Sequence, residues 1–178
     1  MLKLDTYIGA LKLHRTDGLQ VDCPLTFNNA INFLGSITGG QTNTVSAQPA
    51  TVALTAAQSG SVILFDRAAG IIYTLPAPVV GLSFRFIVTT TITSNNAKVI
   101  TDASTTFLQG IVDSATVTPT NTSFFGDGTT HRAVTQNGTT TGGIIGSYLE
   151  FNCVTATIWN VFAATQGSGA LATPFAAS

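Results

Sequence analysis

Apolar residues gather in short runs separated by turn signals across residues 59–93. The runs cover residues 62–65, 71–75 and 82–91, with Pro, Gly and Asp between them. In the last run apolar and polar positions alternate, and one face carries Leu82, Phe84, Phe86 and Val88. A period of two with β-branched and aromatic residues is typical of a half-buried strand. We therefore expect residues 59–93 to form the folding centre of the chain.

Strand-like segments continue beyond this centre. They cover residues 97–101, 106–112, 144–152 and 154–163. The last two form a candidate hairpin, and Gly110 within the second indicates a β-bulge. No segment shows helical 3.6 periodicity over ten residues. The sequence therefore predicts an all-β fold, as an antiparallel β-sandwich or barrel-like domain with an extended N-terminal arm.

The pattern divides the chain into three parts. Residues 1–50 hold short alternating pieces and a polar linker, and such pieces are too short to form a stable sheet alone. They need a partner, either the main domain or another chain. Residues 51–165 form the predicted β domain. Residues 166–178 are rich in Gly, Ala, Ser and Thr, which predicts a flexible C-terminal tail.

Charge is scarce along the whole chain. Charged residues make up 8% of the 178 residues, and the net charge is −1; a typical soluble domain carries about 25%. A monomer with so few charges is poorly protected against association. We therefore expect much of the surface to face other protein.

Composition also argues against other partners. No run approaches the ~18 apolar residues of a membrane-spanning helix, and an early Asp5 makes the N-terminus a poor signal peptide. The 7 Lys and Arg residues are scattered and form no basic patch. We expect neither a membrane nor nucleic acid as a partner.

The two cysteines, Cys23 and Cys153, lie far apart in the sequence. Without a secretion signal they are interpreted as two small buried side chains in a reducing compartment, and a disulfide is the alternative. No Cys and His spacing fits zinc, no loop fits calcium, and the glycines form no phosphate loop.

Catalytic residues are hard to assemble from this sequence. A hydrolase would pair His131 with Asp127 and a serine, yet no nucleophile motif is present. His131 is therefore interpreted as an exposed histidine at a strand end. Trp159 could be a sugar platform, but its apolar neighbours favour a core or interface anchor. We expect no enzyme, no cofactor and no metal.

One resemblance goes beyond this pattern, and it covers residues 54–163. It is carried by LTAAQSG (54–60), FD (65–66), AAG (68–70), TLPAP (74–78), GLSFRF (81–86), GSYLEF (146–151) and WNV (159–161). On these segments the chain resembles capsid decoration (cement) proteins of tailed bacteriophages. The likeness rests on a strand-and-turn pattern, not on a catalytic signature.

The resemblance implies a homotrimer on the outer surface of a capsid, bound to the major capsid protein and assembled in the host cytoplasm. On this hypothesis the partner-binding residues are apolar side chains outside the main strands: Leu4, Tyr7, Leu11, Leu13, Leu25, Phe27, Phe33 and Phe175. Arg85, a charge on an otherwise uncharged strand, is a further candidate for a partner contact.

An alternative comes from residues 25–39, which are faintly similar to fibre-shaft segments. The chain would then be a head-fibre or tail-fibre protein that binds a glycan or host surface. Trp159, Tyr148 and the Thr-rich loops motivate this alternative.

Overall fold

The computed structural model describes residues 44–45, 48–116 and 120–178. The chain divides into two compact units, Met1–Gly40 and Gln41–Ser178. Every described residue belongs to the second unit, so the predicted arm and linker of residues 1–50 are described only at residues 44–45 and 48–50. Within the second unit the structure is all-β, with one short 3-10 turn at Ala56–Gln58.

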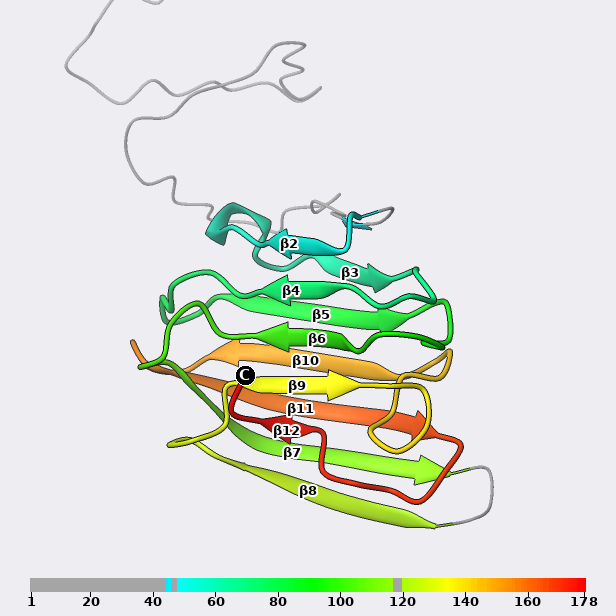
Figure 1. The fold of residues 1–178 in the computed structure, drawn as a ribbon. Coiled ribbons are helices and arrows are strands. Elements are labelled where there is room, and N and C mark those ends of the chain that lie inside the picture. The colour runs from blue at the N-terminus through cyan, green and yellow to red at the C-terminus, as the bar shows by residue number, and fades with distance from the viewer. Residues whose placement is uncertain (1–43, 46–47, 117–119) are drawn as a thin grey trace, which may run out of the picture. The chain divides into compact units, whose positions relative to one another are not determined.

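The described strands form two sheets that pack face to face (Figure 1). The seven-stranded sheet contains, in spatial order, β1 (Thr44–Val45), β3 (Val62–Phe65), β5 (Ser83–Val88), β10 (Tyr148–Cys153), β11 (Ile158–Gly167), β7 (Phe107–Thr116) and β8 (Asn121–Asp127). The five-stranded sheet contains β12 (Phe175–Ala176), β9 (Ala133–Gln136), β6 (Ala97–Ile100), β4 (Ile72–Thr74) and β2 (Thr51–Ala53). The predicted β-sandwich is confirmed.

Strand pairing differs from the antiparallel expectation. Successive strands from β2 to β6 alternate between the two sheets, as Figure 1 shows. As a result β2, β4 and β6 are parallel neighbours in one sheet, and β1, β3 and β5 are parallel neighbours in the other. β7 and β11 are also parallel. The predicted hairpin of β10 and β11 is confirmed, and β5, β6, β7, β8, β9 and β12 also take part in antiparallel pairs.

Aromatic side chains explain why the chain crosses between the sheets. Tyr73 of β4 faces Phe65 of β3 and Phe86 of β5, with ring centroids 5.2 and 5.5 Å apart. All three side chains are buried. Each strand has one strongly apolar face, so consecutive strands on opposite sheets can bury these faces against each other. A meander in one sheet would leave them without an opposing layer.

The hydroxyl group of Tyr73, which is buried in this aromatic cluster, has a hydrogen-bond partner. The Tyr73 hydroxyl donates to the Leu64 carbonyl oxygen at 2.9 Å. Burial, and to a smaller extent the charge of Asp66, raises the pKa of Tyr73 above its usual range. Tyr73 therefore stays neutral and anchors the two layers to each other.

The predicted flexible tail is wrong for residues 166–178. β11 continues to Gly167, and β12 pairs with β9. The Arg132 amide donates to the Ala176 carbonyl oxygen and the Thr135 amide to that of Pro174, both at 2.8 Å. The compact unit also begins before residue 51, at Gln41. Gly and Ser in the tail are turn residues that return the chain to the sheet.

Gly110 does not form the predicted bulge. β7 keeps one-to-one register with β8 and β11 through this position. Gly110 has a φ of +130°, and a Cβ there would lie 2.0 Å from the Val161 carbonyl oxygen. Glycine is required because the backbones of β7 and β11 approach closely.

We predict that Gly110→Ala lowers the free energy of unfolding by about 3 kcal/mol, because the new methyl group meets fixed backbone in an unfavourable φ region. The matched control is Gly60→Ala, where φ is +83° and nothing lies within 4 Å of the added Cβ. That variant should lose only about 1–2 kcal/mol. Urea unfolding measures both, and equal losses would contradict the close-approach explanation.

Candidate binding surface

An exposed apolar row crosses the outer face of the seven-stranded sheet. Strand register places Phe162 of β11 beside Ile111 of β7, and Ile111 beside Phe125 of β8. Phe125 is 69% exposed and Phe162 is 53% exposed, while Ile111 is half-buried. Large apolar side chains that gather on a surface indicate a site of interaction. We call Phe162, Ile111 and Phe125 the apolar row.

Local alternation explains why these rings face outward. Trp159 and Val161 point into the core from β11, so Phe162 must point to the other side of the sheet. In β8 the inward position is taken by Phe124, which packs against the core. Phe125 follows it directly and is therefore turned outward.

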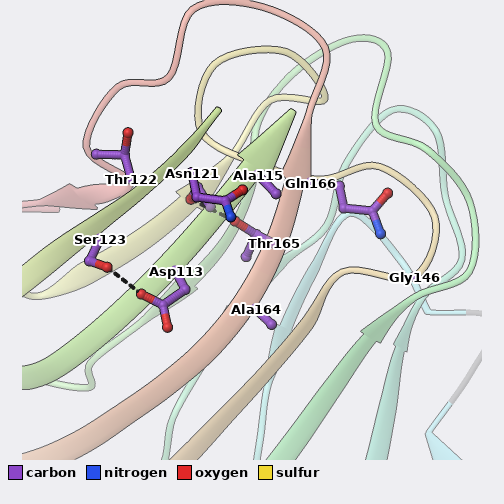
Figure 2. A pocket seen from close by; sticks show the side chains of 10 residues that line it. Asp113, Ala115, Asn121, Thr122, Ser123, Gly146, Ala164, Thr165 and Gln166 are labelled. Carbon is purple, nitrogen blue, oxygen red and sulfur yellow. Dashed lines mark hydrogen bonds between the residues drawn. The ribbon is translucent and has the colours of Figure 1, made fainter. Parts of the chain in front are cut away.

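Two hollows flank the apolar row. One, of about 460 Å³, lies beside the row and is lined also by Gln109, Asp127 and Asn160. The other, of about 490 Å³, lies further along β7, β8 and β11 (Figure 2). Figure 2 shows Asp113 and Ser123 side by side on neighbouring strands, where the Ser123 hydroxyl donates to Asp113 at 2.6 Å. The second hollow is lined by hydroxyl, amide and carboxylate groups and by no aromatic ring.

A polar cluster borders the row at the centre of the sheet. Glu150 accepts hydrogen bonds from the Tyr148 hydroxyl and from the Asn152 amide, the latter at 3.0 Å. These bonds hold the pKa of Glu150 below its usual range. Arg85 lies 4.0 Å from the same carboxylate and is exposed. Such an exposed ion pair contributes under ~1 kcal/mol, so the Arg85 side chain can also meet a partner.

Asp127 organises the turn after β8. Its carboxylate accepts a hydrogen bond from the Thr130 hydroxyl and from the amides of Thr129 and Thr130, the two amide bonds being 2.9 Å long. The His131 amide donates to it at 3.2 Å. These donors hold the pKa of the Asp127 carboxyl well below its usual range. The carboxylate is a local cap for the turn.

The structure brings His131 and Asp127 together, with Nδ1 of His131 3.3 Å from the Asp127 carboxylate. The Asp127 amide donates to Nδ1 of His131 at 3.2 Å, so Nδ1 is an acceptor. In a triad the histidine Nδ1–H instead donates a hydrogen bond to the aspartate carboxylate. The ring of His131 is half-buried, not exposed as predicted, and its centroid lies 5.3 Å from that of Phe175.

Two other predicted contact residues are buried. Trp159 has 0% exposure and packs against Phe84 with centroids 5.9 Å apart, so the core interpretation is confirmed and the sugar platform is wrong. Phe175 is 5% exposed and its ring lies against the backbone of Gly126. The prediction that Phe175 contacts another chain is therefore wrong, because its own domain covers it.

The remaining partner-binding residues, Leu4, Tyr7, Leu11, Leu13, Leu25, Phe27 and Phe33, lie outside the described residues, as does Cys23. Cys153 is a free, buried cysteine whose thiol donates to the Thr155 carbonyl oxygen at 3.2 Å. Burial raises the pKa of this thiol. Cys153 therefore behaves as a small core residue.

Among the described residues, no three His, Cys, Asp or Glu side chains are grouped so as to hold a metal ion. Nor does any helix in that part of the chain have the length and apolar character to span a membrane.

The chain was compared with known proteins in three ways. No protein-family model matches it, and neither curated proteins nor solved structures gave a match.

We predict that Asp127→Asn destabilises the protein at pH 7 and that the loss shrinks as the pH falls below about 4. The folded pKa lies below the unfolded value, so the carboxylate stabilises the fold above that value and loses this effect as protons bind. Urea unfolding at pH 7 and pH 3 measures the difference.

The control for this prediction is Asp102→Asn, which removes the same charge from an exposed loop position. A general charge effect would appear in both variants. A loss for Asp127→Asn that is equally large at both pH values would contradict the proposed role of the carboxylate.

Proposed function

We propose that the protein is a structural virion protein that decorates the outer surface of a phage capsid and stabilises it by bridging capsid subunits. One observation carries the proposal: the residues from Gln41 onward form a compact unit of their own. The buried hydrophobic residues that line its core run from Leu54 to Phe175. Residues 1–40 belong to a separate unit, and in this proposal they bind the partner.

The N-terminal segment suits such a role. Its short alternating pieces can add a strand to the edge of another protein's sheet, where backbone hydrogen bonds supply affinity and apolar side chains supply specificity. A single contact of this kind can be weak. Repeated over a closed shell, many such contacts add through multivalency. In this proposal the partner is the major capsid protein, and neither nucleic acid nor a membrane takes part.

The surface of the domain agrees with permanent assembly. Charged residues are 8% of the chain, and the apolar row lies exposed on the large sheet. Both features are typical of a protein that is permanently assembled with other proteins. We propose that the decoration protein is a homo-oligomer and that it catalyses no reaction.

The fibre alternative has less support. It relied on Trp159 as a sugar platform, and this ring is buried. Tyr148 is half-buried and bonded to Glu150. The hollow of Figure 2 offers hydroxyl and amide groups but no aromatic ring on which a sugar could stack.

We predict that deletion of residues 1–38 leaves a soluble, folded domain that no longer binds capsids. The reason is that the residues from Gln41 onward form a compact unit of their own, while the proposed contacts lie within residues 1–40. Co-sedimentation with capsid shells that lack the protein measures binding, and circular dichroism verifies the fold.

A point variant refines this test. Phe33→Ser in the full chain should weaken capsid binding by about tenfold, as expected for one apolar anchor. Val80→Ser is a matched control, since Val80 is an exposed apolar residue of the domain. Undiminished binding after the deletion would show that the domain itself carries the contact.

A further inference from the structure

β8 is the one long open edge among the described strands of the sandwich. It lies at the end of the seven-stranded sheet and has 7 residues. The other three terminal strands are far shorter: β1 and β12 have 2 residues each, and β2 has 3. An open edge presents unpaired N–H and C=O groups that can accept another strand.

The alternation of hydrogen bonds between β7 and β8 shows which backbone groups of β8 are still available to a further strand. The Gly128 amide donates to the Leu108 carbonyl oxygen at 3.0 Å, and the Thr116 amide donates to that of Thr120 at 3.1 Å. In an antiparallel ladder the bonded pairs recur at every second residue. The even-numbered residues of β8 therefore bond to β7, and the odd-numbered ones face away from it.

The outward-facing backbone of β8 belongs to Asn121, Ser123, Phe125 and Asp127. The amide of Asp127 already donates to His131. Within the described residues, no segment outside the regular strands donates a backbone hydrogen bond to Ser123 or Phe125, or accepts one from them. Their peptide groups form a ready ladder for a further strand.

β8 also lacks the usual protection against pairing. Natural edge strands carry Lys, Pro or a bulge that discourages a partner. The sequence of β8 is NTSFFGD, with no Lys, Arg or Pro. Its register with β7 is regular along its whole length. Phe125, the most exposed large apolar residue described, lies on this strand with 69% exposure.

We propose that β8 pairs with β8 of a second copy of this chain, antiparallel about a two-fold axis, so that the two seven-stranded sheets become one. A second copy fits because it supplies a strand of equal length, whereas the other described edges have 2 or 3 residues. A two-fold interface uses the same patch on both subunits and closes after two copies.

Charge and packing select the register. The residues of β8 whose backbone groups face away from β7 have odd numbers. In the new pair each of them must therefore lie opposite an odd-numbered residue of the partner strand. Centring the axis on Phe124 places Phe125 opposite Ser123 of the partner subunit and Asp127 opposite Asn121 of the partner subunit. The two Asp127 carboxylates then stay apart, and each can meet an amide. The apolar rows of both copies join end to end across the new pair, where the two Phe125 residues become diagonal neighbours.

This inference concerns the isolated protein and does not rest on the proposed function. Analytical ultracentrifugation of the full chain should show a dimer. Phe125→Lys should raise the dimer dissociation constant at least about a hundredfold, because it places a charge at the pairing edge. Phe162→Lys is the matched control, two strands away in the same row, and should raise it less than about fivefold.

Three results of that experiment would overturn the proposal. A wild-type monomer at all concentrations would do so, as would a trimer that Phe125→Lys leaves intact. Equal losses in the two lysine variants would show docking through the sheet face and not through its edge. Both substituted residues are exposed, so circular dichroism should show an unchanged fold.

A cross-link identifies the occupant of the edge directly. In the proposed register the two copies of residue 123 are diagonal neighbours, about 7–8 Å apart. The variant Ser123→Cys, treated with a short bis-maleimide, should give a covalent dimer joined through the introduced thiols, as read by mass spectrometry. A link from the introduced thiol to Cys23 of another copy would place the N-terminal segment on the edge instead. That link, or no link at all, would contradict the pairing of β8 with β8.

Discussion

Contact between aromatic rings of opposite sheets is the interaction on which the rest of this fold depends. Tyr73 meets Phe65 and Phe86 across the interior, and Phe86 in turn packs on Phe151 with centroids 5.4 Å apart. Because these rings come from the successive strands β3, β4 and β5, the chain crosses from one sheet to the other between these strands. Parallel pairing within each sheet is the geometric result.

The outer face of the large sheet follows from the inner one. Trp159 fills the core, so its neighbours on β11 are divided strictly between inside and outside, and Phe162 is left in solvent. A chain richer in charge would place Lys or Glu at such positions. Here the charged groups near the row are held in local roles, with Glu150 bonded to Tyr148 and Asp127 capping its turn. The phenylalanine side chains of the apolar row, in contrast, remain exposed and available for contact with another protein.

Much of this fold could be predicted from alternation alone. The strands around residues 62–88 and 148–163 carry clear period-two patterns, and the core position of Trp159 followed from its neighbours. The same alternation could have placed Phe162 outward. Strand order could not be predicted, because the sequence of a turn does not show whether the turn joins two strands of one sheet or strands of different sheets. The outward orientation of Phe125 could not be predicted, because two adjacent phenylalanines in a sequence do not show which one faces the core. The pairing of residues 166–178 with the sheets depends on backbone hydrogen bonds, which cannot be predicted from the small side chains of this segment.

The pairing of β7 with β11 has a consequence for how the chain folds during synthesis. These strands form the longest parallel pair, and Phe107 lies opposite Ile158. The ribosome makes β7 well before its neighbour exists, and a nascent chain exposes that side of β7 until β11 emerges. Contacts between residues so distant in sequence slow folding and prolong the exposure of apolar surface. The seven-stranded sheet can therefore be completed only after β11 has been made, although β7 is already present.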